Sequence, residues 1–201
     1  ATPLYIACDK GHVDAARLLL DKGAEVDRAD EDGRTPLFVA CFKGHVDTAR
    51  LLLDKGAEVD RADKNGMTPL YAACESGHVD TARLLLDEGA DVNRANTCSG
   101  TPLHIACDQG HVDAARLVLE NGAEVDRAMN DGRTPLFVAC WNGHVDAARL
   151  CLDRDAEIDR AENNGATPLC IACQAGHVDA VRLLFARGAD AKLRISRAGR
   201  R

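Results

Sequence analysis

One segment decides the fold: Thr35-Pro36-Leu37-Phe38-Val39-Ala40-Cys41-Phe42-Lys43-Gly44-His45. Three of its features, the Thr-Pro pair, the Cys and the Gly-His pair, recur at a constant interval of 33 residues. The Thr-Pro pairs begin at Thr2, Thr35, Thr68, Thr101, Thr134 and Thr167. Because no insertion separates one copy from the next, this self-similarity predicts a single array of six stacked repeats rather than a series of unlike domains.

Each repeat is predicted to form two helices followed by a long turn. Thr35 is typical of a helix N-cap, since its hydroxyl can accept a backbone N–H, and Pro36 suits the first helical position. This helix is expected to end near Gly44, after which a second helix carries apolar residues at helical spacing. Gly56 follows the second helix, where a left-handed residue is favoured. Residues 59–68 are expected to be extended, with a turn signature at 63–66.

The repeat resembles the ankyrin repeat, and the resemblance covers nearly the whole chain. It rests on Gly33-x-Thr35-Pro36-Leu37-x-x-Ala40, on Gly44-His45 and on Leu51-Leu52-Leu53-x-x-Gly56-Ala57-x-Val59. The resemblance implies an all-α ankyrin-repeat solenoid of stacked helix-turn-helix units with β-turn fingers, whose concave face is lined by the fingers and the first helices. Elementary packing agrees, because one helix pair of this size cannot bury its own apolar stripe.

The array is predicted to be one ankyrin repeat domain over residues 1–192, with repeats starting near 1, 34, 67, 100, 133 and 166. The first repeat lacks its finger, and the basic tail 193–201 is expected to be disordered. Neither end shows an obvious polar capping repeat. We therefore expect frayed ends or end-to-end self-association through the apolar surfaces of the terminal repeats.

Composition and charge exclude several classes of protein. The formal net charge is −7, which argues against general binding to nucleic acid or to an anionic membrane, since both need a basic surface. No apolar run has the length of a transmembrane helix, the opening residues do not form a signal peptide, and the missing initiator Met indicates an excised fragment. The nine Cys are odd in number and do not follow a disulfide framework, so we expect a reducing, cytoplasmic setting.

The repeated Cys and His, four positions apart as in Cys41 and His45, have the residue types of a zinc site. They flank the break at Gly44, however, and so do not share one helical face. We interpret the Cys as a small buried core residue. The family resemblance implies that the His hydrogen-bonds backbone and ties neighbouring repeats together. No metal or cofactor is expected, nor are disulfides between equivalent Cys, because neighbouring helices pack too far apart.

Three Cys lie outside the repeated column. Cys151 replaces a Leu and is expected in the core, Cys170 stands at the position of Phe38, and Cys98 is expected to be the most exposed thiol. Two further departures concern the backbone. Asp155 replaces the Gly that ends the second helix in the other repeats, and the run 96–100 shifts the turn Gly by one place, which predicts a distorted fourth finger.

Nothing in the sequence indicates catalysis. No Gly-rich phosphate loop follows a strand, and no unique set of His, acid and nucleophile stands out. His104 lies outside the Gly-His column at a position where the family usually carries His, so we interpret it as structural. The finger row that starts at Arg28 is interpreted as solvated surface, because an Asp, or Asn93 in one repeat, precedes each Arg and largely cancels its charge.

Partner binding is predicted where the repeats differ from one another, since a surface that discriminates needs differing side chains. The resemblance implies that these columns face the concave groove. Phe42 and Trp141 replace acids and amides and are candidate hot spots, with Met67 as a third apolar anchor. Arg34 and Arg133 occupy the adjoining finger column and can pair with carboxylates. The full predicted set is Arg34, Phe42, Lys43, Met67, Glu75, Asp108, Gln109, Arg133, Trp141 and Asn142.

The predicted function is non-catalytic binding of a protein partner of unknown identity, with neither nucleic acid nor membrane as a partner. Three alternatives stay open. The near-identity of repeats 2 and 5 is consistent with an engineered or excised array that has no native partner. The Cys content is consistent with a thiol or zinc module. Asn93, with Leu85 eight residues before it, matches the position that an ankyrin-directed asparaginyl hydroxylase modifies.

Overall fold

The computed structural model describes residues 1–192, and all regular elements among them are α-helices. The predicted tail, 193–201, lies outside the described residues. The first helices of the repeats are α1 (Pro3–Asp9), α3 (Pro36–Phe42), α5 (Pro69–Glu75), α7 (Pro102–Gln109), α9 (Pro135–Asn142) and α11 (Pro168–Ala175). The second helices are α2 (Val13–Asp21), α4 (Val46–Asp54), α6 (Val79–Asp87), α8 (Val112–Glu120), α10 (Val145–Leu152) and α12 (Val178–Ala186). The predicted pair of helices is thus present in each of the six repeats.

The helices begin and end where the capping residues predict. The Thr35 hydroxyl accepts the N–H of Phe38 at 3.1 Å, and Pro36 is the first residue of α3. After α4 the chain reverses at Gly56, whose φ is +85°, in the left-handed region that favours glycine. Both sequence predictions are therefore confirmed in this repeat.

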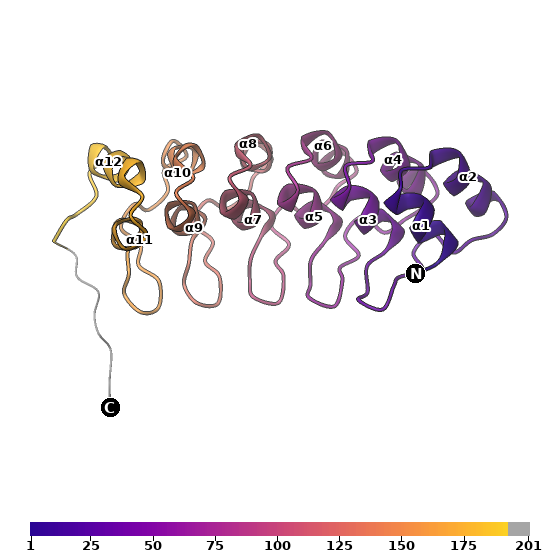
Figure 1. Ribbon diagram of the computed structural model, residues 1–201, viewed down its shortest axis with the longest axis horizontal. Helices are drawn as coiled ribbons and strands as arrows, with labels where there is room; N and C mark the ends of the chain where they lie inside the picture. The colour runs from indigo at the N-terminus through magenta and orange to yellow at the C-terminus, as the bar shows by residue number, and fades with distance from the viewer. Residues whose placement is uncertain (193–201) are drawn as a thin grey trace, which may run out of the picture. The chain divides into compact units, whose positions relative to one another are not determined.

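The chain divides into two compact units, which we call unit 1 (Ala1–Thr97, with α1 to α6) and unit 2 (from Cys98, with α7 to α12). In unit 1, α1, α3 and α5 lie side by side in one layer and α2, α4 and α6 in a second (Figure 1). Unit 2 repeats this arrangement with α7, α9 and α11 against α8, α10 and α12. In each unit the fingers project from the layer of first helices (Figure 1). The single domain over 1–192 stays a prediction.

The core of each unit lies between the two helix layers and between neighbouring repeats. In repeat 2, Leu37 and Cys41 of α3 and Ala49 and Leu52 of α4 are fully buried. Small Ala and Cys side chains on these faces let the helices approach closely, while Leu fills the space between the layers. The apolar stripe that one repeat cannot bury alone is thus covered by its neighbours within the unit, as the sequence predicts.

A contact between a glycine and a histidine ring fixes the spacing of adjacent repeats. Gly44 has φ +74°, and a Cβ atom there would lie 2.6 Å from Nδ1 of His78 in the next repeat. The glycine is therefore required both for its backbone conformation and because the ring occupies the space of a side chain. His45 packs on Gly11 in the same way, and its Nε2 lies 3.1 Å from the carbonyl oxygen of Asp9. The prediction that this His ties neighbouring repeats together is confirmed at His45.

A second link between repeats was not anticipated from the sequence. The Asp27 carboxylate accepts the backbone N–H of Glu58, 31 residues later, at 3.0 Å, and Asp126 accepts that of Glu157 at 3.1 Å. Interpreting these acids only as neutralising neighbours of the Arg28 row is therefore incomplete. Arg28 itself lies 3.4 Å from Glu25, three residues earlier. The Asp column thus satisfies backbone donors of the following repeat.

Within residues 1–192, two residues other than glycine adopt a left-handed backbone. Asp155 has φ +62°, as expected from its place at a helix end, and Ser99 has φ +63°. The predicted distortion of the fourth finger is not seen at the turn, because Gly100 stands one place late but Ser99 takes the left-handed position that Gly33 and Gly66 hold in their fingers. The turn geometry is kept, at the conformational cost of a residue with a Cβ atom. The boundary between units 1 and 2 falls in this same finger.

The repeated Cys is buried in five repeats but not in the last. Cys8, Cys41, Cys74, Cys107 and Cys140 are fully buried, whereas Cys173 is exposed, so the prediction of a buried core residue is wrong at Cys173. Cys8 is buried although no repeat precedes it in the chain described, which shows that the following repeat provides the cover. Among the described residues no further repeat packs beyond α11 and α12. Cys98 is exposed as predicted.

Substituting Gly44 by Ala tests the role of the glycine–histidine contact. We expect Gly44→Ala to lower the free energy of unfolding by about 2–4 kcal/mol, because left-handed strain adds to a clash with the His78 ring. Gly56→Ala is the matched control, since Gly56 has a similar φ and no neighbouring atom within 4 Å. It should cost only about 1–2 kcal/mol. Urea unfolding of both variants measures the difference, and equal losses would show that the ring contact has no role in stability.

Candidate functional site

The residues predicted to bind a partner fall into two groups of five, one in each unit. Arg34, Phe42, Lys43, Met67 and Glu75 belong to unit 1, and Asp108, Gln109, Arg133, Trp141 and Asn142 belong to unit 2. Each group lies on the first helices and fingers of its own unit. The geometry of the two groups differs, and they are therefore taken separately.

The unit 1 group surrounds a single hollow of about 290 Å³, which we call the unit 1 groove. All five predicted residues of unit 1 are among those that line it. The lining residues are Tyr5, Asp9, Arg34, Phe38, Val39, Phe42, Lys43, Met67 and Glu75. They come from three consecutive repeats, so stacking is what brings them together. The volume lies near the lower end of the range for small-ligand pockets.

Helix α3 supplies the apolar part of the groove. Phe38 and Phe42 are four residues apart and therefore share one face of this helix. Phe38 is buried, whereas Phe42, at the C-terminal end of α3, is 37% exposed, as predicted for a candidate anchor. The Lys43 ammonium lies 5.5 Å from the centre of the Phe42 ring, within the range of a cation–π contact. A positive charge thus lies close to the Phe42 ring.

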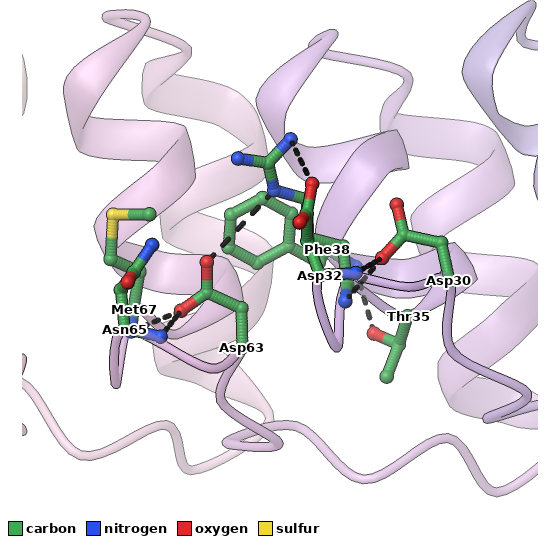
Figure 2. A network of polar contacts seen from close by, with 8 residues as sticks. Asp30, Asp32, Thr35, Phe38, Asp63, Asn65 and Met67 are labelled. Atoms are coloured by element: carbon green, nitrogen blue, oxygen red, sulfur yellow. Dashed lines mark hydrogen bonds and ion pairs between the residues drawn. The ribbon is translucent and has the colours of Figure 1, made fainter.

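Carboxylates in the fingers hold the backbone at Arg34 and Met67, and Figure 2 shows Asp30 and Asp63 in these positions. Asp63 is fully buried in its side chain, and its Oδ1 accepts the backbone N–H of Asn65 at 2.8 Å and of Met67 at 2.9 Å. Asp30 closes the preceding finger in the same way, because its Oδ1 accepts the N–H of Arg34 at 2.9 Å. The sequence shows Asp63 only as part of a turn signature. Its role in placing groove residues was missed.

Two buried polar atoms at this point make no hydrogen bond. Nε of Arg34 lies 3.9 Å from Oδ2 of Asp63, and neither atom has another hydrogen-bond partner (Figure 2). Nη1 of Arg34 lies 3.7 Å from Asp32, so the acid that faces this Arg stands two residues before it rather than beside it. The guanidinium carbon is 5.8 Å from the centre of the Phe38 ring. Arg34 is therefore oriented by its surroundings without being fully engaged by them.

The opposite rim of the groove carries Tyr5 and Asp9. Nζ of Lys10 lies 2.8 Å from Oδ2 of Asp9, and Nζ of Lys43 lies 4.0 Å from Oδ1. The hydrogen bond from Lys10, together with the charge of Lys43, holds the pKa of Asp9 below its ordinary value. Burial, followed by the nearby Asp30 carboxylate, raises the pKa of Tyr5 to about 12. Asp9 is thus ionised and Tyr5 neutral at physiological pH.

In unit 2 the equivalent aromatic residue is already stacked. The Arg133 guanidinium carbon lies 4.3 Å from the centre of the Trp141 ring, and Nε of Arg133 lies 3.2 Å from Oδ2 of Asp131. Trp141 is 39% exposed, in agreement with its prediction as a surface aromatic. One face of the indole, however, is covered by Arg133, and the Phe137 ring lies 6.0 Å away. Its free surface is therefore smaller than the sequence suggests.

The polar members of the unit 2 group hydrogen-bond one another. Nδ2 of Asn142 donates to Oδ1 of Asp108 at 2.9 Å, and Nε2 of Gln109 donates to Oδ2 of the same carboxylate at 2.9 Å. Asn142 also donates to the Val138 carbonyl at 3.2 Å. These side chains lie together as predicted, but much of their hydrogen-bonding capacity is used within the unit.

His104 and Cys151 are buried and have structural roles, as predicted. His104 is buried, Thr101 donates its backbone N–H to Nδ1, and Nε2 lies 3.2 Å from the carbonyl oxygen of Arg133. Cys151 is in the core as predicted, and its Sγ lies 3.6 Å from Sγ of Cys107, a pairing that the 33-residue spacing does not reveal. A hydrogen bond with Cys151, together with burial, raises the pKa of Cys107, which keeps it a thiol.

Residues 1–192 contain neither a metal-binding cluster nor a membrane-spanning helix. No group of three or more His, Cys, Asp or Glu side chains in this range is arranged to hold a metal ion. None of the helices in the range is long and apolar enough to cross a bilayer.

Comparison with known proteins gives matches at the level of both sequence and structure. A family model for ankyrin repeats, built of three copies, matches residues 1–63, 58–129 and 124–195. The crystal structure of the human ASB11 ankyrin repeat domain is similar to this chain with a TM-score of 0.91 and 31% sequence identity. The similarity covers 99% of this chain and 89% of that one. No curated protein matches the sequence.

The environment of His104 predicts a pH dependence of stability. Burial lowers the pKa of His104 to about 4, below the value of 6.5 in an unfolded chain. The unfolded state therefore binds the proton more readily, so stability is complete above pH 6.5 and falls as the pH drops toward 4. Between pH 7 and pH 5 the loss should be about 2 kcal/mol. The variant His104→Phe has the residue that occupies the equivalent position in repeats 2 and 5, Phe38 and Phe137. Urea unfolding of this variant should lack this part of the pH dependence. An unchanged slope would contradict the assignment.

Proposed function

Because the chain belongs to the ankyrin repeat family, we propose that it binds a protein partner through the concave groove formed by its fingers and first helices. Ankyrin repeat domains are generally protein–protein interaction modules and are typically non-catalytic. The observation that carries the proposal is the convergence of all five predicted residues of unit 1 on one hollow. They were selected because their columns vary between repeats and because the family resemblance implies that these columns face the concave groove, and their convergence on one hollow supports that choice.

The chemistry of these residues supports a binding surface. Phe42 and Trp141 expose aromatic area beside a cation, and aromatic residues with Arg are the types that contribute most to protein interfaces. Both rings are held by short helices in a packed unit, so little side-chain freedom is lost on binding. The polar groups around them offer a rim with hydrogen-bonding capacity.

The setting and the alternatives follow from the same residues. We propose a reducing, intracellular location, supported by the nine free cysteines. The thiol or zinc alternative is not supported by any converging cluster in residues 1–192. No geometric observation favours an array without a partner over an array that binds one. None favours modification at Asn93 over binding in the groove.

Truncating the two aromatic anchors tests the proposed function. Phe42→Ala and Trp141→Ala should each weaken binding of a partner isolated by affinity purification by more than about 1 kcal/mol, or roughly fivefold, because each removes exposed aromatic area. Arg50→Ala, at an exposed position of α4, is the control and should bind as the unmodified chain does. Titration by calorimetry gives the affinities. A partner that binds both truncated variants with unchanged affinity would exclude this surface.

The exposed apolar end of unit 1 favours self-association as a second proposal. Leu18 is 61% exposed, whereas Leu51, the equivalent residue of repeat 2, is 3% exposed. Ile6 is 54% exposed, while Val39 at the equivalent position is buried. In repeats 2 and 3 the preceding repeat covers these positions. The surface that can cover them in repeat 1 is therefore the side of another repeat that normally faces the following repeat. In unit 2, Cys173, Val178 and Phe185 of the last repeat are exposed.

We expect head-to-tail association between the α1–α2 end of one chain and the α11–α12 end of another, which is a heterologous contact. Leu18→Glu and Phe185→Glu should each be monomeric in analytical ultracentrifugation, while the unmodified chain forms concentration-dependent oligomers. An equimolar mixture of the two variants should form dimers and nothing larger, since only one free end of each kind remains. A monomeric unmodified chain at high concentration, or dimers of Phe185→Glu alone, would contradict this contact.

A further inference from the structure

Among the described residues, the two cations that line the unit 1 groove make no hydrogen bond through their side chains, and this indicates what the groove binds. The inference deepens the proposed function and rests on it. It concerns the chemistry of the segment that enters the groove, which neither the family nor the exposure of Phe42 specifies.

The floor of the groove is apolar. Phe38 and Val39 are buried beneath it, and Phe42 and Met67 line it with partly exposed side chains. A hollow of about 290 Å³ with such a lining fits one large apolar side chain rather than a folded surface. Met67 suits this role because its flexible thioether adapts to the shape of the inserted group.

The cations of the groove have no hydrogen-bond partner among the described residues. Arg34 carries four N–H donors on its terminal nitrogens and one on the buried Nε, and its nearest carboxylates, Asp32 and Asp63, are 3.7 and 3.9 Å away, beyond hydrogen-bond distance. Lys43 carries three donors, and the carboxylate that it faces, Asp9, is 4.0 Å away. Both side chains are partly exposed, so a ligand can reach them.

The carboxylates near the groove are engaged or out of a ligand's reach. The Oδ1 of Asp63 accepts two backbone N–H groups, and its Oδ2, which makes no hydrogen bond, is buried. Asp9 is in contact with the Lys10 ammonium at 2.8 Å. Glu75, which also lines the groove, has an interaction within the chain. A basic ligand would have to displace these contacts, whereas an acidic ligand would use free donors.

Unit 2 provides the contrast within the same molecule. Arg133 occupies the same finger column as Arg34, but its guanidinium stacks on Trp141 at 4.3 Å and its Nε lies 3.2 Å from Asp131. The Arg133 guanidinium is thus held by stacking and by a closer ion pair, although its Nε, like that of Arg34, makes no hydrogen bond. The two positions differ in how closely the guanidinium is held.

We propose that the unit 1 groove binds an acidic peptide segment of the protein partner, in which a large apolar side chain enters the hollow and an adjacent Asp or Glu carboxylate pairs with Arg34 and Lys43. A guanidinium binds a carboxylate through two parallel N–H···O bonds, which gives the contact direction as well as strength. The contacts of Asp30 and Asp63 hold the backbone of the two fingers, so the donors are positioned before the ligand arrives.

The test uses the full chain and a phage-displayed library of random twelve-residue peptides. Peptides are selected on the unmodified chain after depletion on an Arg34→Gln/Phe42→Ala double variant. The expected result is enrichment of peptides in which Asp or Glu adjoins Leu, Ile, Phe or Trp. Enrichment of basic or uncharged peptides would overturn the inference, as would the absence of any peptide that prefers the unmodified chain.

Selected peptides are then synthesised with a fluorescent label and titrated by anisotropy. Arg34→Gln should weaken binding about tenfold, in the range for a charged hydrogen bond, and Arg34→Lys, which keeps the charge without the paired donors, should weaken it less. Arg50→Gln, at an exposed position of α4 outside the predicted set, is the control and should change the affinity by less than about twofold. Replacing the peptide's Asp or Glu by Asn or Gln should reproduce the loss seen in Arg34→Gln. Thermal unfolding of each variant confirms that it is folded.

The outcome separates this inference from the proposed function. Peptides whose affinity is unchanged by Arg34→Gln but reduced by Trp141→Ala would overturn the acidic ligand. Binding of a partner to the surface formed by the fingers and first helices would then still stand. Partner binding that is insensitive to both aromatic truncations would overturn the proposed function itself.

Discussion

The fold depends on one constraint, which is that no repeat can bury its own apolar flank. Each repeat of a unit covers its neighbour, and the contact is close enough that a histidine ring occupies the space where Gly44 would carry a side chain. The Gly-His pair therefore sets the distance between repeats. Buried Cys and Ala at the interfaces keep the helices near one another, and the Asp27 column satisfies backbone donors across the same gap. Each copy of the repeated sequence therefore forms the same interface with its neighbour.

The same constraint leaves a defined part of each repeat free to vary. Residues that face a neighbour are fixed by packing, and the finger backbones are held by hydrogen bonds such as that from the Lys64 N–H to the Asp32 carbonyl at 2.9 Å. The side chains at the ends of the first helices and on the fingers are less constrained. The fingers are closed locally by their own side chains, as when Asp63 accepts the N–H groups of Asn65 and Met67. A rigid turn then carries whatever residue occupies the next column. Arg34 and Met67 owe their placement to this arrangement, and the proposed binding surface is assembled from several repeats although each contributes only a few side chains.

The sequence was sufficient for most of the framework and for part of the surface. Thr35 and Gly56 mark helix ends through their local capping chemistry. Polar residues at the positions equivalent to Phe42 in other repeats predicted that Phe42 is exposed. Other features depend on contacts between residues that are distant in sequence. The stacking of Arg133 on Trp141 and the proximity of Cys107 to Cys151 belong to this kind. Cys173 departs from its column because burial requires a neighbour on the correct side, and a repeat pattern alone does not show whether that neighbour is present.

The placement of the aromatic residues has a practical consequence for spectroscopy. The chain contains one Trp and two Tyr, and Trp141 lies in unit 2 whereas Tyr5 and Tyr71 lie in unit 1. Excitation at wavelengths that only indole absorbs therefore reports on unit 2 alone. Because the Arg133 guanidinium lies against the indole face, the emission of this single fluorophore is sensitive to the local charge above the ring. The intrinsic fluorescence of the unmodified chain can thus follow one half of the array without an attached dye.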